Sequence, residues 1–127
     1  MASILIIDDN IALGEMVAGS LRSADHTAWH GPSGKAGFQL MQEQAIDLVI
    51  SDIVMPDQDG LKVVMRLKKS RPRLQVILMS GDRPERAPLY LSIGRKLGAT
   101  RTLLKPFSLP TLLATVAAVV GERGSAK

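Results

Sequence analysis

Apolar residues follow two alternating patterns along the chain. Short continuous runs rich in Ile, Val and Leu are separated by longer stretches in which apolar residues recur every three or four positions. The continuous runs predict strands that are buried on both faces, and the spaced positions predict amphipathic helices. The predicted strands cover residues 4–8, 27–30, 47–52, 74–80 and 100–104, and the predicted helices cover 13–21, 33–41, 61–67, 85–97 and 108–120.

Strict alternation of five strands and five helices predicts a parallel sheet with helices on both faces. Ser33 and Ser108 are signals for helix starts, Pro110 suits a first helical turn, and Gly98 suits a helix end. No internal repeat or linker interrupts the pattern. We therefore expect one doubly wound α/β domain over residues 1–121, followed by a short C-terminal tail over 122–127.

Composition narrows the class of protein. A chain of 127 residues is long enough to bury one core, and the absence of cysteine excludes disulfides and thiolate metal sites. The longest apolar stretch near the end, residues 112–121, is too short to cross a bilayer. No basic segment precedes the first strand, so a signal peptide is not indicated. These features favour a cytoplasmic protein that does not bind membranes.

Charge is distributed unevenly. The formal net charge is +4, but residues 1–61 hold two Lys or Arg and nine Asp or Glu, whereas residues 62–127 hold fourteen and three. Four of the basic residues lie between Lys68 and Arg73, where a predicted helix ends and cations favour the helix dipole. Only 3% of the residues are aromatic, which argues against a platform for stacking bases. Direct binding of nucleic acid is therefore not expected.

Chemically active residues gather at the carboxyl ends of the predicted strands, where open α/β sheets bind their ligands. Asp8 and Asp9 end the first strand, Asp52 the third, Ser80 the fourth, and Lys105 the fifth. Three crowded carboxylates need a cation, and oxygen ligands without His or Cys favour Mg²⁺. A hydroxyl and a lysine beside them suit the oxygens of a phosphoryl group.

The same positions carry a family resemblance. The chain resembles the receiver domain of two-component response regulators over residues 3–121, and it would be of the stand-alone, single-domain type. Four motifs in the expected order carry the resemblance: Asp8-Asp9-Asn10, the segment from Ser51-Asp52 to Asp59-Gly60, Ser80-Gly81, and Gly98-Ala99 followed by Lys105-Pro106-Phe107.

The resemblance implies a flavodoxin-like sheet with strand order 2-1-3-4-5 and a phosphoryl-accepting site. Asp52 would accept a phosphoryl group from a histidine kinase or a histidine phosphotransfer protein. Asp9, Asp52 and the backbone carbonyl of Val54 would bind Mg²⁺, and Asp8 would assist through water. The protein would then catalyse its own phosphorylation and dephosphorylation and would not be a metabolic enzyme.

The resemblance also implies how the modification is transmitted. Ser80 and Lys105 would contact the phosphoryl oxygens, and the change would reach a downstream protein target through the surface of a monomer or weak dimer. The peptide between Lys105 and Pro106 is often cis in the family.

Two departures from the family pattern keep an alternative open. Thr102 stands where the family usually has an aromatic switch residue, and the segment between Ser80 and Lys105 is longer than usual, with the extra residues expected in 81–88. A receiver-like interaction module with a weakened or lost switch is therefore the second hypothesis. A dedicated aspartyl phosphatase is disfavoured, because Val54 occupies the position of the required general acid.

Two other features have structural interpretations. Asp8 and Asp9 could instead be a pair of helix-capping residues. His26 and His30 flank Trp29 on the second predicted strand, and we expect both to be surface or edge residues far from the candidate site.

Overall fold

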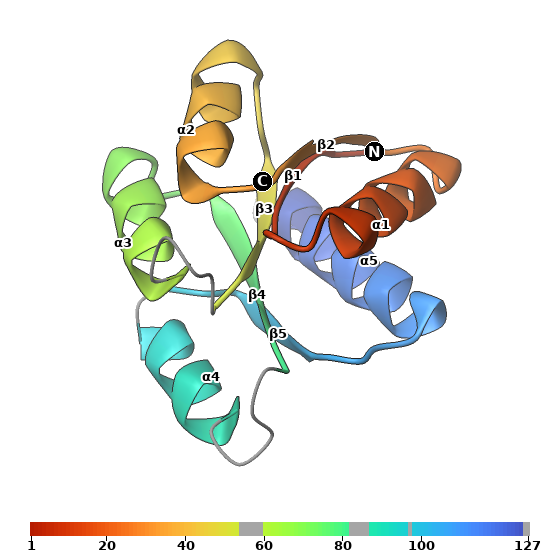
Figure 1. Cartoon of the computed structure of the whole chain (residues 1–127). Coiled ribbons are helices and arrows are strands. Elements are labelled where there is room, and N and C mark those ends of the chain that lie inside the picture. The colour runs from red at the N-terminus through yellow and green to blue at the C-terminus, as the bar shows by residue number, and fades with distance from the viewer. Residues whose placement is uncertain (54–59, 82–86, 97, 126–127) are drawn as a thin grey trace.

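The computed structural model describes residues 1–53, 60–81, 87–96 and 98–125. Within these ranges the chain alternates between strands and helices, as the sequence predicts (Figure 1). The elements are β1 (Ser3–Ile7), α1 (Ile11–Ser23), β2 (Thr27–Gly31), α2 (Gly34–Glu43), β3 (Leu48–Asp52), α3 (Gly60–Ser70), β4 (Gln75–Ser80), α4 (Ala87–Lys96), β5 (Arg101–Leu104) and α5 (Leu109–Ser125).

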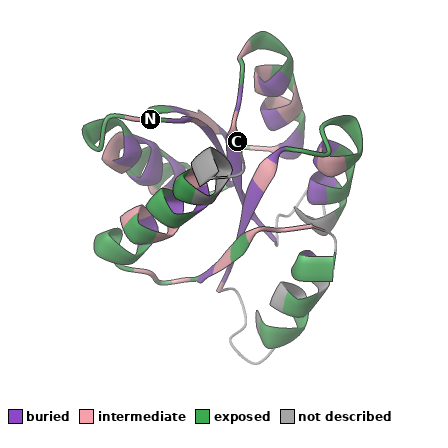
Figure 2. Cartoon of the chain, turned by 180° about the vertical axis from the view of Figure 1, so that it is seen from behind, coloured by how far each residue is buried: buried purple, intermediate pink, exposed green. Residues whose placement is uncertain are grey.

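The strands form one parallel sheet with the order β2-β1-β3-β4-β5, which confirms the predicted doubly wound fold. Successive side chains of a strand point to opposite faces, so each strand contributes to two cores. Ile4 and Ile6 of β1 pack with α1 and α5, whereas Leu5 and Ile7 pack with α2 and α3. Figures 1 and 2 show these helices on opposite sides of a largely buried sheet.

Side chains and one glycine define the helix ends. Asn10 Oδ1 accepts a hydrogen bond from Leu13 N at the start of α1, and Ser33 and Ser108 cap α2 and α5 in the same way. Gly98 follows α4 with φ of 108°, a conformation that glycine adopts without a Cβ clash. The predictions for Ser33, Ser108 and Gly98 are therefore confirmed.

The last helix is longer than expected. Residues 108–120 were predicted as helix from apolar spacing, but α5 continues to Ser125. Gly121 costs only about 1 kcal/mol in a helix, and the following Glu122 and Arg123 favour helix formation. The boundary expected at residue 121 therefore falls inside a helix.

Two sets of residues with predicted roles lie outside the described residues. These are residues 54–59, which include Val54, and residues 82–86, where part of the lengthened segment between Ser80 and Lys105 was expected. In the part of the chain that is described, no helix combines the length and apolar character needed to span a membrane.

Candidate functional site

The strand register brings the predicted site residues to one edge of the sheet. Ile7 pairs with Ser51, so Asp8 lies level with Asp52 at the end of β3. Ser80 pairs with Leu104, which places Lys105 directly beyond β5. Residues far apart in sequence therefore meet because parallel strands end together.

Asp8 is completely buried, and neighbouring groups hold its carboxylate in place. Its Oδ1 accepts a hydrogen bond of 2.9 Å from the backbone N–H of Asn10, and its Oδ2 accepts one of 2.9 Å from Lys105 Nζ. A carboxylate can be buried at modest cost only when it is paired in this way. Asn10, not Asp8 or Asp9, caps α1, so the capping interpretation of the two aspartates is wrong.

Lys105 links the two buried carboxylates of the site. Its Nζ lies 2.9 Å from Asp8 Oδ2 and 3.3 Å from Asp52 Oδ2. Burial alone would lower the pKa of Lys105, but the hydrogen bond with Asp8 and the charge of Asp52 raise this pKa above its ordinary value. The lysine is therefore held as a cation between Asp8 and Asp52, and the peptide that joins it to Pro106 is cis.

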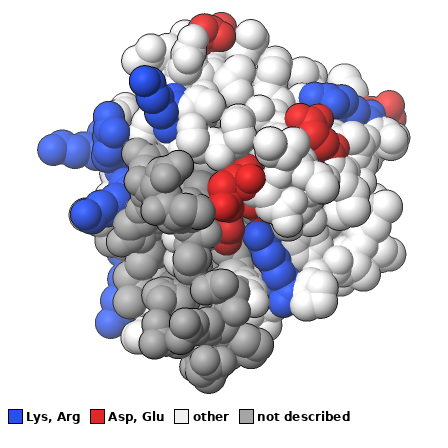
Figure 3. Space-filling view, in the orientation of Figure 1, with Lys and Arg blue, Asp and Glu red and all other residues white. Residues whose placement is uncertain are grey.

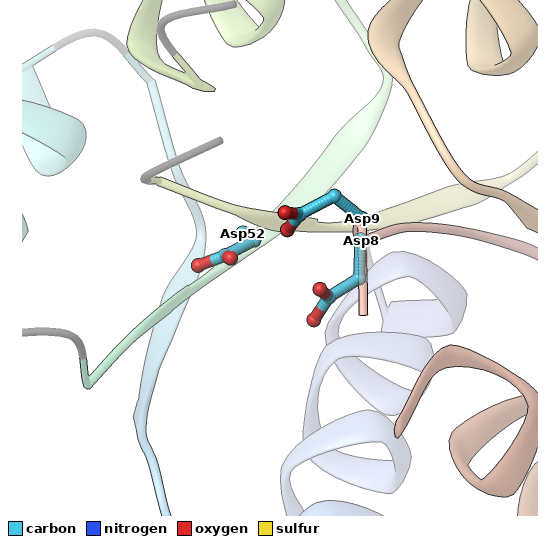
Figure 4. A group of neighbouring side chains, drawn as sticks. All are labelled: Asp8, Asp9 and Asp52. Carbon is cyan, nitrogen blue, oxygen red and sulfur yellow. The ribbon is translucent and has the colours of Figure 1, made fainter. Parts of the chain in front are cut away.

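Asp8, Asp9 and Asp52 form a group that fits a divalent metal ion. Each offers a carboxylate oxygen, and these oxygens lie within 4.8 Å of one another. Figure 4 shows the three side chains turned toward a common space, and Figure 3 shows acidic surface near the centre of this face. Asp9 is exposed, so the site is open to solvent. An open set of carboxylate oxygens suits Mg²⁺, which keeps several waters when it binds.

Ser80 supplies a polar group that makes no hydrogen bond to the described residues. Its side chain is buried, and Oγ has no hydrogen-bond partner among the described residues. Leaving a buried hydroxyl unpaired costs about 1–3 kcal/mol. Such a group suits an acceptor that arrives from outside, such as a phosphoryl oxygen.

Thr102 lies half-buried on β5, where it pairs with Leu78 of β4. The structure thus places the residue that replaces the usual aromatic on the strand that leads to Lys105.

His30 corrects the sequence analysis. Its side chain is only 3% exposed, and its Nε2 lies 2.8 Å from the carbonyl oxygen of Asp8. The sequence analysis placed it on the second strand as a surface or edge residue far from the site. However, β2 pairs directly with β1, so its carboxyl end lies beside Asp8. A histidine at the end of a strand adjacent to Asp8 was the signal in the sequence that could have revealed this contact.

His26 behaves as expected for a residue away from the site. It precedes β2, at the opposite end of the strand from His30, and its Nδ1 accepts a hydrogen bond from Ala2 N. That acceptor role requires an unprotonated nitrogen, and burial lowers the pKa of His26 accordingly.

Comparison with known proteins identifies the family of the chain. The family model for the response regulator receiver domain matches residues 4–117. The probable transcriptional regulatory protein SilR of Salmonella typhimurium is 34% identical over 115 residues, which cover 89% of this chain and 48% of that protein.

Solved structures give the same result. The receiver domain of NtrX from Brucella abortus matches with a TM-score of 0.86 and 25% identity, over 93% of this chain and 98% of that one. The chemotaxis protein CheY4 of Vibrio cholerae matches with a TM-score of 0.81 and 28% identity, over 94% and 98%.

The first curated relatives are longer than this chain, which spans 12%, 48% and 23% of their lengths. The match to the family model, in contrast, includes every described strand except the first residue of β1. The chain belongs to the response regulator receiver domain family.

Proposed function

We propose that this protein is a phosphoryl-accepting switch of a two-component or phosphorelay system, with Asp52 as the acceptor. The observation that carries the proposal is the position of Lys105 Nζ. This atom pairs with both Asp8 and Asp52, which together with Asp9 form an acidic cluster. A lysine in this position can contact the oxygens of a phosphoryl group on Asp52 and stabilise the negative charge that this group adds.

The reaction requires positioning and charge neutralisation more than covalent chemistry by the protein. An oxygen of the Asp52 carboxylate forms a bond to phosphorus while the bond from phosphorus to the donor imidazole nitrogen breaks. The electron pair leaves with that nitrogen. Lys105 keeps Asp52 ionised before the attack, because its positive charge favours the carboxylate form.

Magnesium fits the donor set and would supply charge neutralisation at the phosphoryl oxygens. Asp9 and Asp52 would hold the ion directly, the backbone carbonyl of Val54 would complete the set, and Asp8 would act through water. Ser80 would donate its hydroxyl to a phosphoryl oxygen, because this buried group has no partner among the residues that the structure describes.

The partners follow from the same proposal. The phosphoryl donor would be a histidine kinase or a histidine phosphotransfer protein, and a downstream protein would receive the signal from a monomer or weak dimer. The cytoplasmic location expected from the sequence remains part of this proposal.

The test is labelling with acetyl phosphate, or with a phosphohistidine donor, in the presence of Mg²⁺. Asp52→Asn should abolish incorporation, and chelation of Mg²⁺ should abolish it in the wild type. Asp47→Asn is the matched control. Asp47 lies just before β3, at the amino ends of the strands and so opposite the candidate site, and its carboxylate accepts a hydrogen bond from Ser3 N. Stable labelling of Asp52→Asn would refute the assignment.

The same experiment separates the switch from the interaction module. Thr102 is the observation that favours the module, because a small side chain on β5 offers no ring to move between exposed and buried positions. A wild-type protein that binds a partner but takes up no phosphoryl group would support the module and contradict the switch.

A further inference from the structure

The imidazole of His30 is wedged between β1 and α1, next to the acidic cluster. Nε2 lies 2.8 Å from the carbonyl oxygen of Asp8, and Nδ1 lies 3.2 Å from Oε1 of Glu15. The His30 side chain is 3% exposed, whereas that of Glu15 is 59% exposed. The contact with Asp8 is therefore the more enclosed of the two.

The contact with Asp8 requires a proton on Nε2 of His30. A carbonyl oxygen can only accept a hydrogen bond, so Nε2 must be the donor. The imidazole thus donates to the carbonyl group of the peptide that joins Asp8 to Asp9.

With this bond, every polar group of Asp8 is restrained. Its N–H donates to the carbonyl of Gly31 at 3.2 Å, and its carbonyl accepts from His30. Its two carboxylate oxygens accept from Asn10 N and Lys105 Nζ. Two of the four hydrogen bonds come from Gly31 and His30 at the end of β2, and both are made to the main chain of Asp8.

The space for the ring depends on Gly14. A methyl group at this position of α1 would overlap His30 Nε2, so a larger residue would displace the imidazole from Asp8. Gly14 is buried inside a helix, where glycine is unfavourable by about 1 kcal/mol relative to alanine. Close approach of the ring explains why a glycine is needed here.

We propose that His30 is a positioning residue for the metal site. By fixing the Asp8 carbonyl it fixes the plane of the peptide between Asp8 and Asp9, and thereby the direction from which the Asp9 carboxylate reaches the metal. The inference rests on the proposed function, because it concerns the Mg²⁺ site of that mechanism. Groups that orient the ligands of a metal typically change its affinity 10- to 100-fold when they are removed.

Three substitutions of His30 separate the hydrogen bond from simple filling of space. Gln carries its amide nitrogen the same number of bonds from the backbone as Nε2, so His30→Gln can still donate to Asp8. Asn carries its amide nitrogen at the level of Nδ1 and cannot reach that carbonyl. His30→Leu fills the space without a donor.

The readout is Mg²⁺ affinity, measured on the unphosphorylated full chain by following amide resonances during titration with Mg²⁺ alone. We expect His30→Asn and His30→Leu to bind Mg²⁺ roughly 10-fold more weakly than the wild type, and His30→Gln to remain close to it. Gly14→Ala should resemble His30→Leu, because it displaces the ring without removing it. Before Mg²⁺ is added, the amide resonance of Asp9 should move in the Asn and Leu variants and stay in place in the Gln variant.

Several outcomes would overturn the inference. Equal affinity in the wild type and all three variants would show that the bond to Asp8 does not orient the site. Equal weakening in all three, including Gln, would show that the ring is needed for packing only. A wild-type protein that binds no Mg²⁺ would instead refute the proposed function, and the role of His30 in a metal site would fall with it.

Discussion

Removal of the Ser80 hydroxyl should have opposite effects on the unmodified and the modified protein. In the unphosphorylated, Mg²⁺-free state, Oγ is buried without a partner among the described residues, which costs about 1–3 kcal/mol. Ser80→Ala removes this cost and loses a little packing. We therefore expect the free energy of unfolding to rise by about 1 kcal/mol, which corresponds to roughly 4 °C in Tm for a chain of this size.

The sign reverses when a phosphoryl analogue occupies the site. A hydrogen bond to a charged acceptor contributes about 1.5–3 kcal/mol. If Ser80 donates to the analogue, Ser80→Ala should weaken the binding of beryllofluoride roughly 10- to 100-fold in the presence of Mg²⁺.

Ser51 provides a matched control on the neighbouring strand. It is equally buried, but its hydroxyl donates to the carbonyl of Asp52 at 3.2 Å. Ser51→Ala should therefore lower the free energy of unfolding by about 1 kcal/mol, in contrast to Ser80→Ala. Urea denaturation with a metal chelator present measures both. Destabilisation of Ser80→Ala to the same extent as Ser51→Ala, or an unchanged affinity for beryllofluoride, would refute the reasoning.

Three further predictions concern the neighbouring residues. In Mg²⁺-free solution, Lys105→Met should lower the free energy of unfolding by roughly 2 kcal/mol at neutral pH. Because the pKa of Lys105 is raised in the folded state, this difference from the wild type should be complete below the ordinary pKa of 10.5 and should shrink as the pH rises through the folded-state pKa. Denaturation at several pH values measures it. Asp9→Ala should weaken Mg²⁺ binding more than Asp8→Ala, and equal losses in calorimetric titration would contradict the direct role of Asp9. Beryllofluoride should change amide exchange across β5 less in the wild type than in Thr102→Tyr; strong protection of wild-type β5 would show that Thr102 does not limit the switch.

The local pattern of the sequence was sufficient to predict the architecture. Strands of a parallel sheet are buried on both faces and read as continuous apolar runs, whereas helices reveal one apolar stripe. Polar residues such as Asp8 and Asp52 end those runs. They could therefore be placed at strand ends from the sequence, before the packing was known. The strand order came from the family resemblance, since alternation alone allows more than one order.

The contacts within the site depended on the tertiary structure. Lys105 is 97 positions away from Asp8, and only the register of β1, β3, β4 and β5 brings its Nζ to both Asp8 and Asp52. His30 was misjudged for the same reason: only the pairing of β2 with β1 brings its Nε2 to the carbonyl oxygen of Asp8, with the ring packed against Gly14 of α1. Apolar periodicity repeats every two to four residues and records which face of an element is buried. Which polar atoms then meet across elements is decided by packing between distant segments, which no short stretch of the sequence contains.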